Sequence, residues 1–285
     1  MTKKENIEVH EVANQTMLKE FVMLPYSLYR TNSVWVPPLI ADEYALLSPT
    51  SNPAFQFCDV KMWIATQNGK TVGRIMTIIN HLWIEKNKLQ YGRLSRFECT
   101  NNHLVADALL ATAEAYLRSK DIMAVHGPLG FCNLDHQGVL TEGFEYLPSV
   151  ASEYSMDYYP KFFVRNGYSK QTDWIEFRLT LPKILPLKVN QVAQYVEQRY
   201  GLRCKTLASK KELKAYIPRM FELFNHAFSH LFGTFAFNDA MKQFYAQKYI
   251  NTLQPKYIKV VERTDTELVG FIIALPSLSE AMQKA

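Results

Sequence analysis

The dipeptide Asn68-Gly69 constrains the fold of this chain more than any other local feature. It separates two apolar runs, Val60 to Thr66 and Thr71 to Ile79. Asn and Gly both tolerate the positive φ angles that a two-residue hairpin turn requires. The two runs are therefore expected to pair as antiparallel strands joined by this turn.

A second stretch near the end of the sequence repeats this pattern. The string MWIATQNGKTVGRIMTII, around Val72-Gly73, resembles YIKVVERTDTELVGFIIAL, around Val269-Gly270. Self-similarity of this kind indicates a repeated structural plan. The alternative is that the two strings share only the ordinary pattern of a hairpin.

Helical and strand-like stretches alternate around these hairpins. Apolar residues spaced by three and four indicate helices, and strict alternation indicates strands. The order predicts a mixed α/β layer, with one complete copy of the plan and an incomplete second copy. In the first copy we expect strands at Ile7 to Val12, Arg93 to Cys99, Ile122 to Val125 and Tyr168 to Leu179, and helices at Met17 to Tyr29, His103 to Lys120 and Tyr159 to Arg165. In the second we expect helices at Gln191 to Tyr200, Pro218 to Leu231 and Asp239 to about Leu253, a strand at Leu202 to Leu207, and a hairpin of Tyr257 to Glu262 with Glu267 to Leu275.

The proline-bearing stretch Lys183 to Lys188 is typical of a linker. We therefore expect a first domain over residues 1–182 and an incomplete second domain over residues 183–285. A complete second copy would continue past Ala285, so the plan predicts a chain truncated at its C-terminus.

Charge and hydropathy exclude several classes of protein. The net charge of +5 is too small to mark a nucleic-acid-binding surface. The basic band Lys183 to Lys214 lacks an aromatic stacking platform, so a nucleic-acid partner is not expected. The polar start Met1 to Asn6 has no signal-peptide core, and the longest apolar run, Leu268 to Leu278, is shorter than the ~20 residues of a bilayer span. We expect a cytoplasmic protein with no membrane partner.

The histidines and cysteines do not form a recognisable metal motif. His226 and His230 are spaced as ligands on one helix face, but no HExxH pattern or third ligand accompanies them. The cysteines are too far apart in sequence for a CxxC pair, which predicts free thiols and no metal. They are Cys58, Cys99, Cys132 and Cys204.

Several short strings add a family resemblance. GPLGF begins at Gly127, EGF at Glu142, YYP at Tyr158 and DW at Asp173. With the Val-Gly hairpin and the order of elements, they make the chain resemble the GNAT acyltransferase superfamily, and within it a group of bacterial tandem GNAT-like proteins. The resemblance implies a GNAT fold. It also implies acyl transfer from acetyl-CoA or another acyl-CoA to an amine, carried by a small molecule or a peptide.

The resemblance further implies a CoA-binding loop of pattern Arg/Gln-x-x-Gly-x-Gly/Ala before the central helix. Here the loop falls on the string NNHLVA, which assigns Asn101, Asn102 and Ala106 to the cofactor. Leu104 stands where a glycine would let the backbone approach a phosphate closely, so weak CoA binding is expected. The tyrosine that many members use as a general acid is replaced by Phe163.

The strand Arg93 to Cys99 is the expected place of any chemistry. Alternation puts Arg96 and Glu98 on one face and Phe97 and Cys99 on the other. Under the family resemblance, Phe97 and Cys99 are assigned to the cofactor side. Glu98 is the candidate general base for an amine. The alternative is that Arg96 and Glu98 form a structural ion pair.

The long loop after this region supplies further candidates. His136 and Glu142 lie in it, and long loops on rigid scaffolds often carry function. A histidine titrates near neutrality and could pass a proton, or it could belong to a surface pair. Tyr159, with Tyr154 and Tyr158, is a candidate lining of an acceptor pocket, although core packing explains these rings equally well.

Together these features predict an acyl-CoA N-acyltransferase whose first half shapes the acceptor side, with little activity in the chain as it stands. The competing hypothesis is a non-catalytic ligand-binding or interaction module on the same fold.

Overall fold

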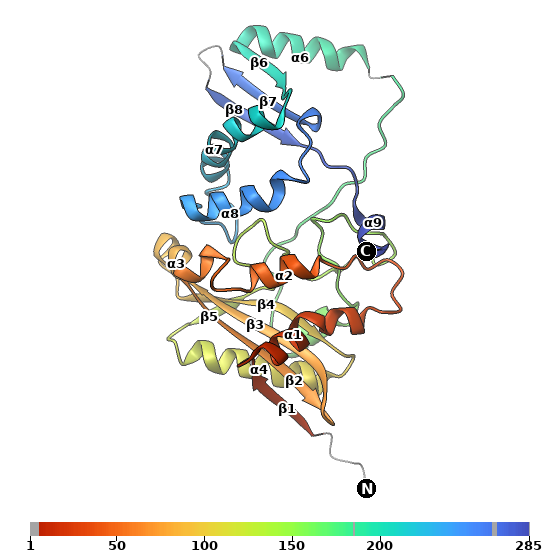
Figure 1. The fold of residues 1–285 in the computed structure, drawn as a ribbon, viewed down its shortest axis with the longest axis vertical. Helices are drawn as coiled ribbons and strands as arrows, with labels where there is room; N and C mark the ends of the chain where they lie inside the picture. The colour runs from red at the N-terminus through yellow and green to blue at the C-terminus, as the bar shows by residue number, and fades with distance from the viewer. Residues whose placement is uncertain (1–5, 185, 264–266, 285) are drawn as a thin grey trace. The chain divides into compact units, whose positions relative to one another are not determined.

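The computed structural model describes residues 6–184, 186–263 and 267–284 (Figure 1). The polar start at residues 1–5, position 185 of the predicted linker, and the turn of the second hairpin at residues 264–266 lie outside the described residues. The chain forms two compact units. Unit 1 is Met1–Thr172 with Gly233–Phe235 and Ser277–Ala285, and unit 2 is Asp173–Phe232 with Ala236–Pro276.

Unit 1 is built on a mixed five-stranded sheet, in agreement with the predicted α/β class. The strands follow the spatial order β1-β2-β3-β4-β5, antiparallel except for the parallel pair of β4 and β5. Asn68 and Gly69 have φ angles of 52° and 73°, so the predicted hairpin turn is confirmed. The strands are β1 (Ile7–Glu11), β2 (Cys58–Gln67), β3 (Lys70–Asn80), β4 (Tyr91–Cys99) and β5 (Ala124–His126).

Helices cover both faces of this sheet. One face carries α4, which buries its apolar stripe, including Leu109 and Ala113, against β3 and its neighbours. The other face carries α1 (Figure 1). The Phe21 ring of this helix lies under the guanidinium of Arg74 on β3. The helices of unit 1 are α1 (Gln15–Leu28), α2 (Ile40–Leu46), the 3-10 turn η1 (Pro53–Gln56), α3 (His81–Asn87), α4 (His103–Arg118), α5 (Tyr159–Arg165) and α9 (Ser279–Lys284).

Unit 2 has a three-stranded antiparallel sheet in the order β6-β7-β8, with a small core around Leu213, Ile258 and Val260. Its hairpin resembles that of unit 1 in register. Gly270 pairs with Val261 just before a register shift, as Gly73 pairs with Ala65 just before one. The elements are α6 (Leu187–Tyr200), β6 (Leu202–Thr206), α7 (Lys210–Ala227), α8 (Asp239–Ile250), the 3-10 turn η2 (Pro255–Tyr257), β7 (Ile258–Arg263) and β8 (Leu268–Ile273).

The predicted strand at Tyr168 to Leu179 is wrong, because these residues do not pair with any strand in the structure. Their alternation is real, but the side chains of Ile175, Phe177 and Leu179 are 72%, 80% and 79% exposed. A strand needs a neighbour that bonds its backbone groups, and an apolar pattern does not supply one.

The predicted start of a helix at Pro218 is also wrong, because α7 begins eight residues earlier at Lys210. A reciprocal pair of side-chain bonds starts the helix there. The Ser209 hydroxyl accepts the Glu212 N–H at 3.2 Å, and the Glu212 carboxylate accepts the Ala208 N–H at 2.7 Å. This pair of bonds resembles a capping box, shifted by one residue, and stabilises the first turn, so that Pro218 lies inside the helix.

The described residues contain neither a membrane-spanning helix nor a cluster of metal-binding side chains. None of their helices is both long and apolar enough to cross a membrane. Nor do three His, Cys, Asp or Glu side chains of the described residues come together as metal ligands would.

Candidate active site

The site begins at a bulge in β4. Arg74 pairs with Glu98 and Met76 with Ser95, so the single β3 residue between them lies opposite two residues of β4. One of the two, Arg96, has a φ of 49°, which is uncommon for a residue other than glycine. A bulge of this kind redirects side chains away from regular alternation.

The bulge separates the two residues that could have formed an ion pair. Arg96 binds Glu43 of α2 instead, with both of its nitrogen–oxygen distances at 3.0 Å. Burial favours a neutral Glu43, but the charges of Arg96 and Arg74 together outweigh this effect and hold the pKa of that carboxyl below its usual value. Glu98 faces Arg74, with Nη2 of Arg74 3.9 Å from Oε1. The expected alternative, a structural Arg96–Glu98 pair, is therefore wrong.

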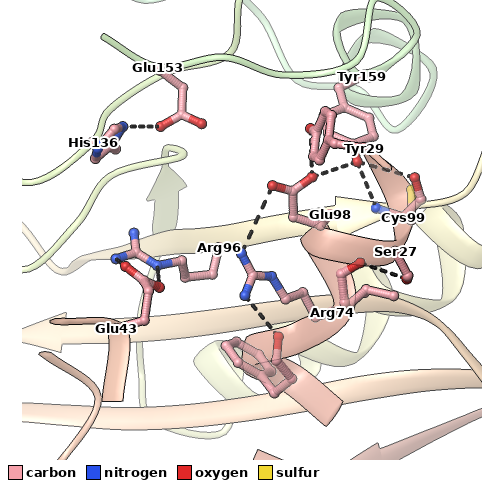
Figure 2. Close-up of polar contacts among 12 residues, drawn as sticks. Ser27, Tyr29, Glu43, Arg74, Arg96, Glu98, Cys99, His136, Glu153 and Tyr159 are labelled. Carbon is pink, nitrogen blue, oxygen red and sulfur yellow. Dashed lines mark hydrogen bonds and ion pairs between the residues drawn. The ribbon is translucent and has the colours of Figure 1, made fainter. Parts of the chain in front are cut away.

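Glu98 is the centre of a buried polar cluster. The hydroxyls of Tyr29 and Tyr159 donate to its Oε2 at 2.8 and 2.7 Å, while Arg74 approaches the other oxygen (Figure 2). Burial raises the pKa of Glu98 to about 7, against the opposing effect of Arg74. This carboxyl can therefore gain and lose a proton near neutral pH.

Tyr159 contacts Glu98 beside the part of β4 that lies beyond its pairing with β5. The paired register of the two strands ends at Arg93 and His126, so they diverge where the sequence placed a candidate site. Past that point, tyrosine hydroxyls bond the peptide groups of Cys99. Tyr159 accepts its N–H at 3.0 Å, and Tyr158 donates to its carbonyl at 2.9 Å. The tyrosines thus satisfy backbone groups that a neighbouring strand would otherwise bond.

Most residues assigned to the cofactor lie in the core of unit 1. The side chains of Phe97 and Cys99 pack among the sheet and α4, and Ala106 is fully buried at the start of that helix. Asn101 is exposed. Asn102 caps α4, because its Oδ1 accepts the backbone N–H of Leu104 at 3.0 Å.

The start of α4 does not fit the phosphate cradle that the family resemblance implies. A phosphate at a helix N-terminus binds to backbone N–H groups that have no other partner. Here Asn102 occupies one of them, and the side chain of Leu104, 44% exposed, stands beside it. Glycine is absent from residues 101–106.

Replacing Leu104 with glycine tests this steric argument. We expect Leu104→Gly to lower the Kd for CoA about tenfold, measured by isothermal titration calorimetry. Glycine weakens a helix by about 1 kcal/mol relative to alanine, so Leu104→Ala is the matched variant that removes the bulk and keeps the helix. An unchanged Kd in both variants would contradict the argument.

A pocket opens beside Glu98 in unit 1. Its charged lining, Glu43, Arg74, Arg96 and Glu98, is buried, whereas apolar residues such as Trp35 are half-buried nearer the surface. The cavity volume is about 110 Å³, room for a few waters or a small polar head group. The pocket therefore combines a charged floor with an apolar rim.

The loop candidates fall in different places. His136 lines the pocket, and its Nδ1 lies 3.2 Å from a carboxylate oxygen of Glu153 (Figure 2). Burial alone would lower the pKa of His136, but the hydrogen bond and charge of Glu153 raise it overall. Glu142 is exposed and does not line this pocket. The structure thus brings His136, Glu98 and the Tyr159 hydroxyl to one region and leaves Glu142 outside it.

Sequence analysis missed four members of this site: Tyr29, Glu43, Arg74 and Glu153. Only Arg74 carried a local signal, since it is the one charged residue in the apolar run after Val72. The other three lie on a helix end, a short helix and a loop, where charged and aromatic residues are ordinary.

Comparison with known proteins gives distant relatives. No protein-family model matches the chain. Protein YghO of Escherichia coli is 26% identical over 277 residues, which is 96% of this chain and 69% of YghO. A bacterial ceramide synthase of Caulobacter vibrioides is 24% identical over 281 residues, 97% of this chain and 72% of that protein.

Among solved structures, this chain is similar to a tandem GNAT protein from the clavulanic acid biosynthesis pathway, at 14% sequence identity and a TM-score of 0.47. The alignment covers 93% of this chain and 73% of the tandem GNAT protein. Unit 1 itself has the order strand, helix, hairpin, strand, helix, parallel strand and helix around a mixed sheet. Up to α5, that order is the one the resemblance implied, but the closing strand expected at Tyr168 to Leu179 is not found among the described residues. Unit 1 therefore has a GNAT-like fold without that strand.

Proposed function

We propose that this chain acts in the transfer of an acyl group from a thioester to an amine, and that unit 1 binds the amine. The observation that carries the proposal is Glu98, a buried carboxyl that titrates near pH 7, bonded by two tyrosines and open to a pocket. Titratable groups with a strongly shifted pKa in a pocket mark candidate functional sites.

The chemistry of amide formation needs a proton acceptor of this kind. The amine nitrogen bonds to the acyl carbon, the thiolate leaves, and the nitrogen gives up a proton. A carboxylate with a pKa near the working pH accepts such a proton efficiently. Tyr29 and Tyr159 hold the Glu98 carboxylate in place, and Arg74 balances its charge.

The form of the pocket supports an amphiphilic acceptor. A neutral amine with a nearby hydroxyl suits the polar floor around Glu98, and an alkyl chain suits the rim around Trp35 and Val150. The Caulobacter relative is named a ceramide synthase, and ceramide is an amide of a long-chain amino alcohol. We therefore propose long-chain amines or amino alcohols as the acceptor class.

A second candidate function rests on the start of α4. Because Asn102 and Leu104 obstruct the expected phosphate cradle, the chain could bind an amine without transferring an acyl group. Such a non-catalytic module would keep the Glu98 pocket.

A single assay separates the two functions. The full chain is incubated with acetyl-CoA or palmitoyl-CoA and with n-decylamine or sphinganine, and amides are detected by mass spectrometry. Amide formed above the level without protein supports the transferase. Saturable binding of the amine without any amide supports the non-catalytic module. If the chain neither forms an amide nor binds the amine, the assignment of the pocket to an amine is overturned.

A further inference from the structure

The helix α9 joins the two walls of the Glu98 pocket. The side-chain amide of Gln283 donates to the carbonyls of Ser33 and Trp35, at 2.9 and 3.0 Å. One turn earlier, the hydroxyl of Ser279 donates to the carbonyl of Pro148 at 2.6 Å. Trp35 and Pro148 both line the pocket, so α9 is bonded to both of its sides.

These two walls come from distant parts of unit 1. Trp35 belongs to the irregular segment after α1, and Pro148 belongs to the long loop between β5 and α5. A second bond, from the side-chain amide of Asn32 to the hydroxyl of Tyr154 at 3.0 Å, links the same two segments. The hydrogen bonds of α9 therefore add a second connection between the two walls, besides the bond between Asn32 and Tyr154.

The side chain of Met282 enters the lining between these two anchors. Met282 is half-buried. Ser279, which bonds Pro148, is fully buried. Methionine is unbranched and flexible, so it can fill gaps of different shapes against an alkyl chain. Because Met282 lines the same pocket as Trp35 and Val150, its apolar side chain suits contact with the alkyl chain of an acceptor.

We propose that α9 is a strap that holds the two pocket walls together, and that Met282 is a specificity-determining residue that sets the size of acceptor admitted. The proposal rests on the proposed function, because it takes the acceptor to be an amine with an apolar chain. Gln283 is exposed, so its bonds can exchange with water and release the strap. Ser279 then remains as the buried anchor.

Hydrogen exchange tests the strap without any ligand. In the full chain, Gln283→Ala should speed backbone exchange at least threefold in peptides covering residues 31–36 and 143–155. The control, Lys284→Ala, changes an exposed position of the same helix and should leave these peptides unchanged. If Gln283→Ala matches the unaltered chain in both peptides, α9 is not a strap.

Calorimetry with n-butylamine and n-decylamine tests the role of Met282. Met282→Trp should raise the Kd for n-decylamine at least tenfold and that for n-butylamine less than twofold. An equal change for both amines, or no change for either, overturns the specificity role. If the unaltered chain binds neither amine, the amine assignment and the specificity role both fail, while hydrogen exchange still decides whether α9 is a strap.

Discussion

Glu98→Gln should reduce the rate of amide formation by about 100- to 10,000-fold, the usual contribution of a general base. Glutamine keeps the shape of the side chain and can still accept hydrogen bonds from Tyr29 and Tyr159, but it cannot take a proton. The measurement is the initial rate of amide formation from acyl-CoA and n-decylamine, followed by mass spectrometry. The variant also takes a counter-charge from the buried Arg74, so the free energy of unfolding is measured in parallel, and the rates are compared under conditions in which both proteins are folded.

The pH dependence of the reaction supplies a second check on Glu98. Since only the carboxylate accepts a proton, the rate should rise with pH and level off above about 7, the pKa to which burial raises this group. Stability should change in the opposite direction. Between the ordinary carboxyl pKa of 4.5 and about 7, the folded state binds more protons at Glu98 than the unfolded state, so its contribution to stability falls as pH rises.

The matched control for Glu98→Gln is Glu85→Gln, at an exposed position of α3. It removes one carboxylate from unit 1 outside the Glu98 pocket. It should keep the rate and its pH profile. Equal rates in Glu98→Gln and Glu85→Gln would mean that Glu98 is not the proton acceptor.

Gly73→Val should destabilise unit 1 by about 3 kcal/mol, at the upper end of the usual range for overpacking a core. A Cβ atom on Gly73 would lie 2.7 Å from Leu109 Cδ1 and 2.8 Å from Val105 Cγ1. Both side chains belong to α4 and are fully buried, so they have little room to move. The added methyl groups of valine would force α4 away from β3.

The repeat in the sequence supplies a matched control. Gly270 has the corresponding place in the second hairpin, but a Cβ there would meet only Val261, at 3.6 Å. Gly270→Val should therefore be neutral or slightly stabilising, since valine favours strands. The free energy of unfolding is measured in urea by circular dichroism and tryptophan fluorescence. Equal losses in the two variants would contradict the close approach of α4 to Gly73.

Local patterns were enough for many elements of this fold. The Asn68-Gly69 turn defines the hairpin of β2 and β3 because its backbone angles follow from those two residues. The apolar stripe of α4 depends on a side-chain period of 3.6, and the alternation over Phe97, Glu98 and Cys99 depends on a period of 2; the sequence shows both directly. For the same reason, Glu98 was separable from Phe97 and Cys99 as a residue of the other sheet face.

The remainder depends on contacts between distant residues. Whether residues 168–179 form a strand depends on backbone pairing with a neighbouring strand, and these residues pair with none of the described strands. The bulge at Arg96 depends on how β4 pairs with β3. Because of the bulge, Arg96 forms an ion pair with Glu43, and Glu98 faces Arg74.

The sequence by itself determined which segments could be strands or helices and that a lone carboxylate stood on β4. Only the tertiary structure decided that this carboxylate would be buried between Tyr29 and Tyr159, which are 69 and 61 residues away from it in the chain. The physical reason is that burial and long-range hydrogen bonds set the pKa of Glu98, and neither is encoded in the residues next to it.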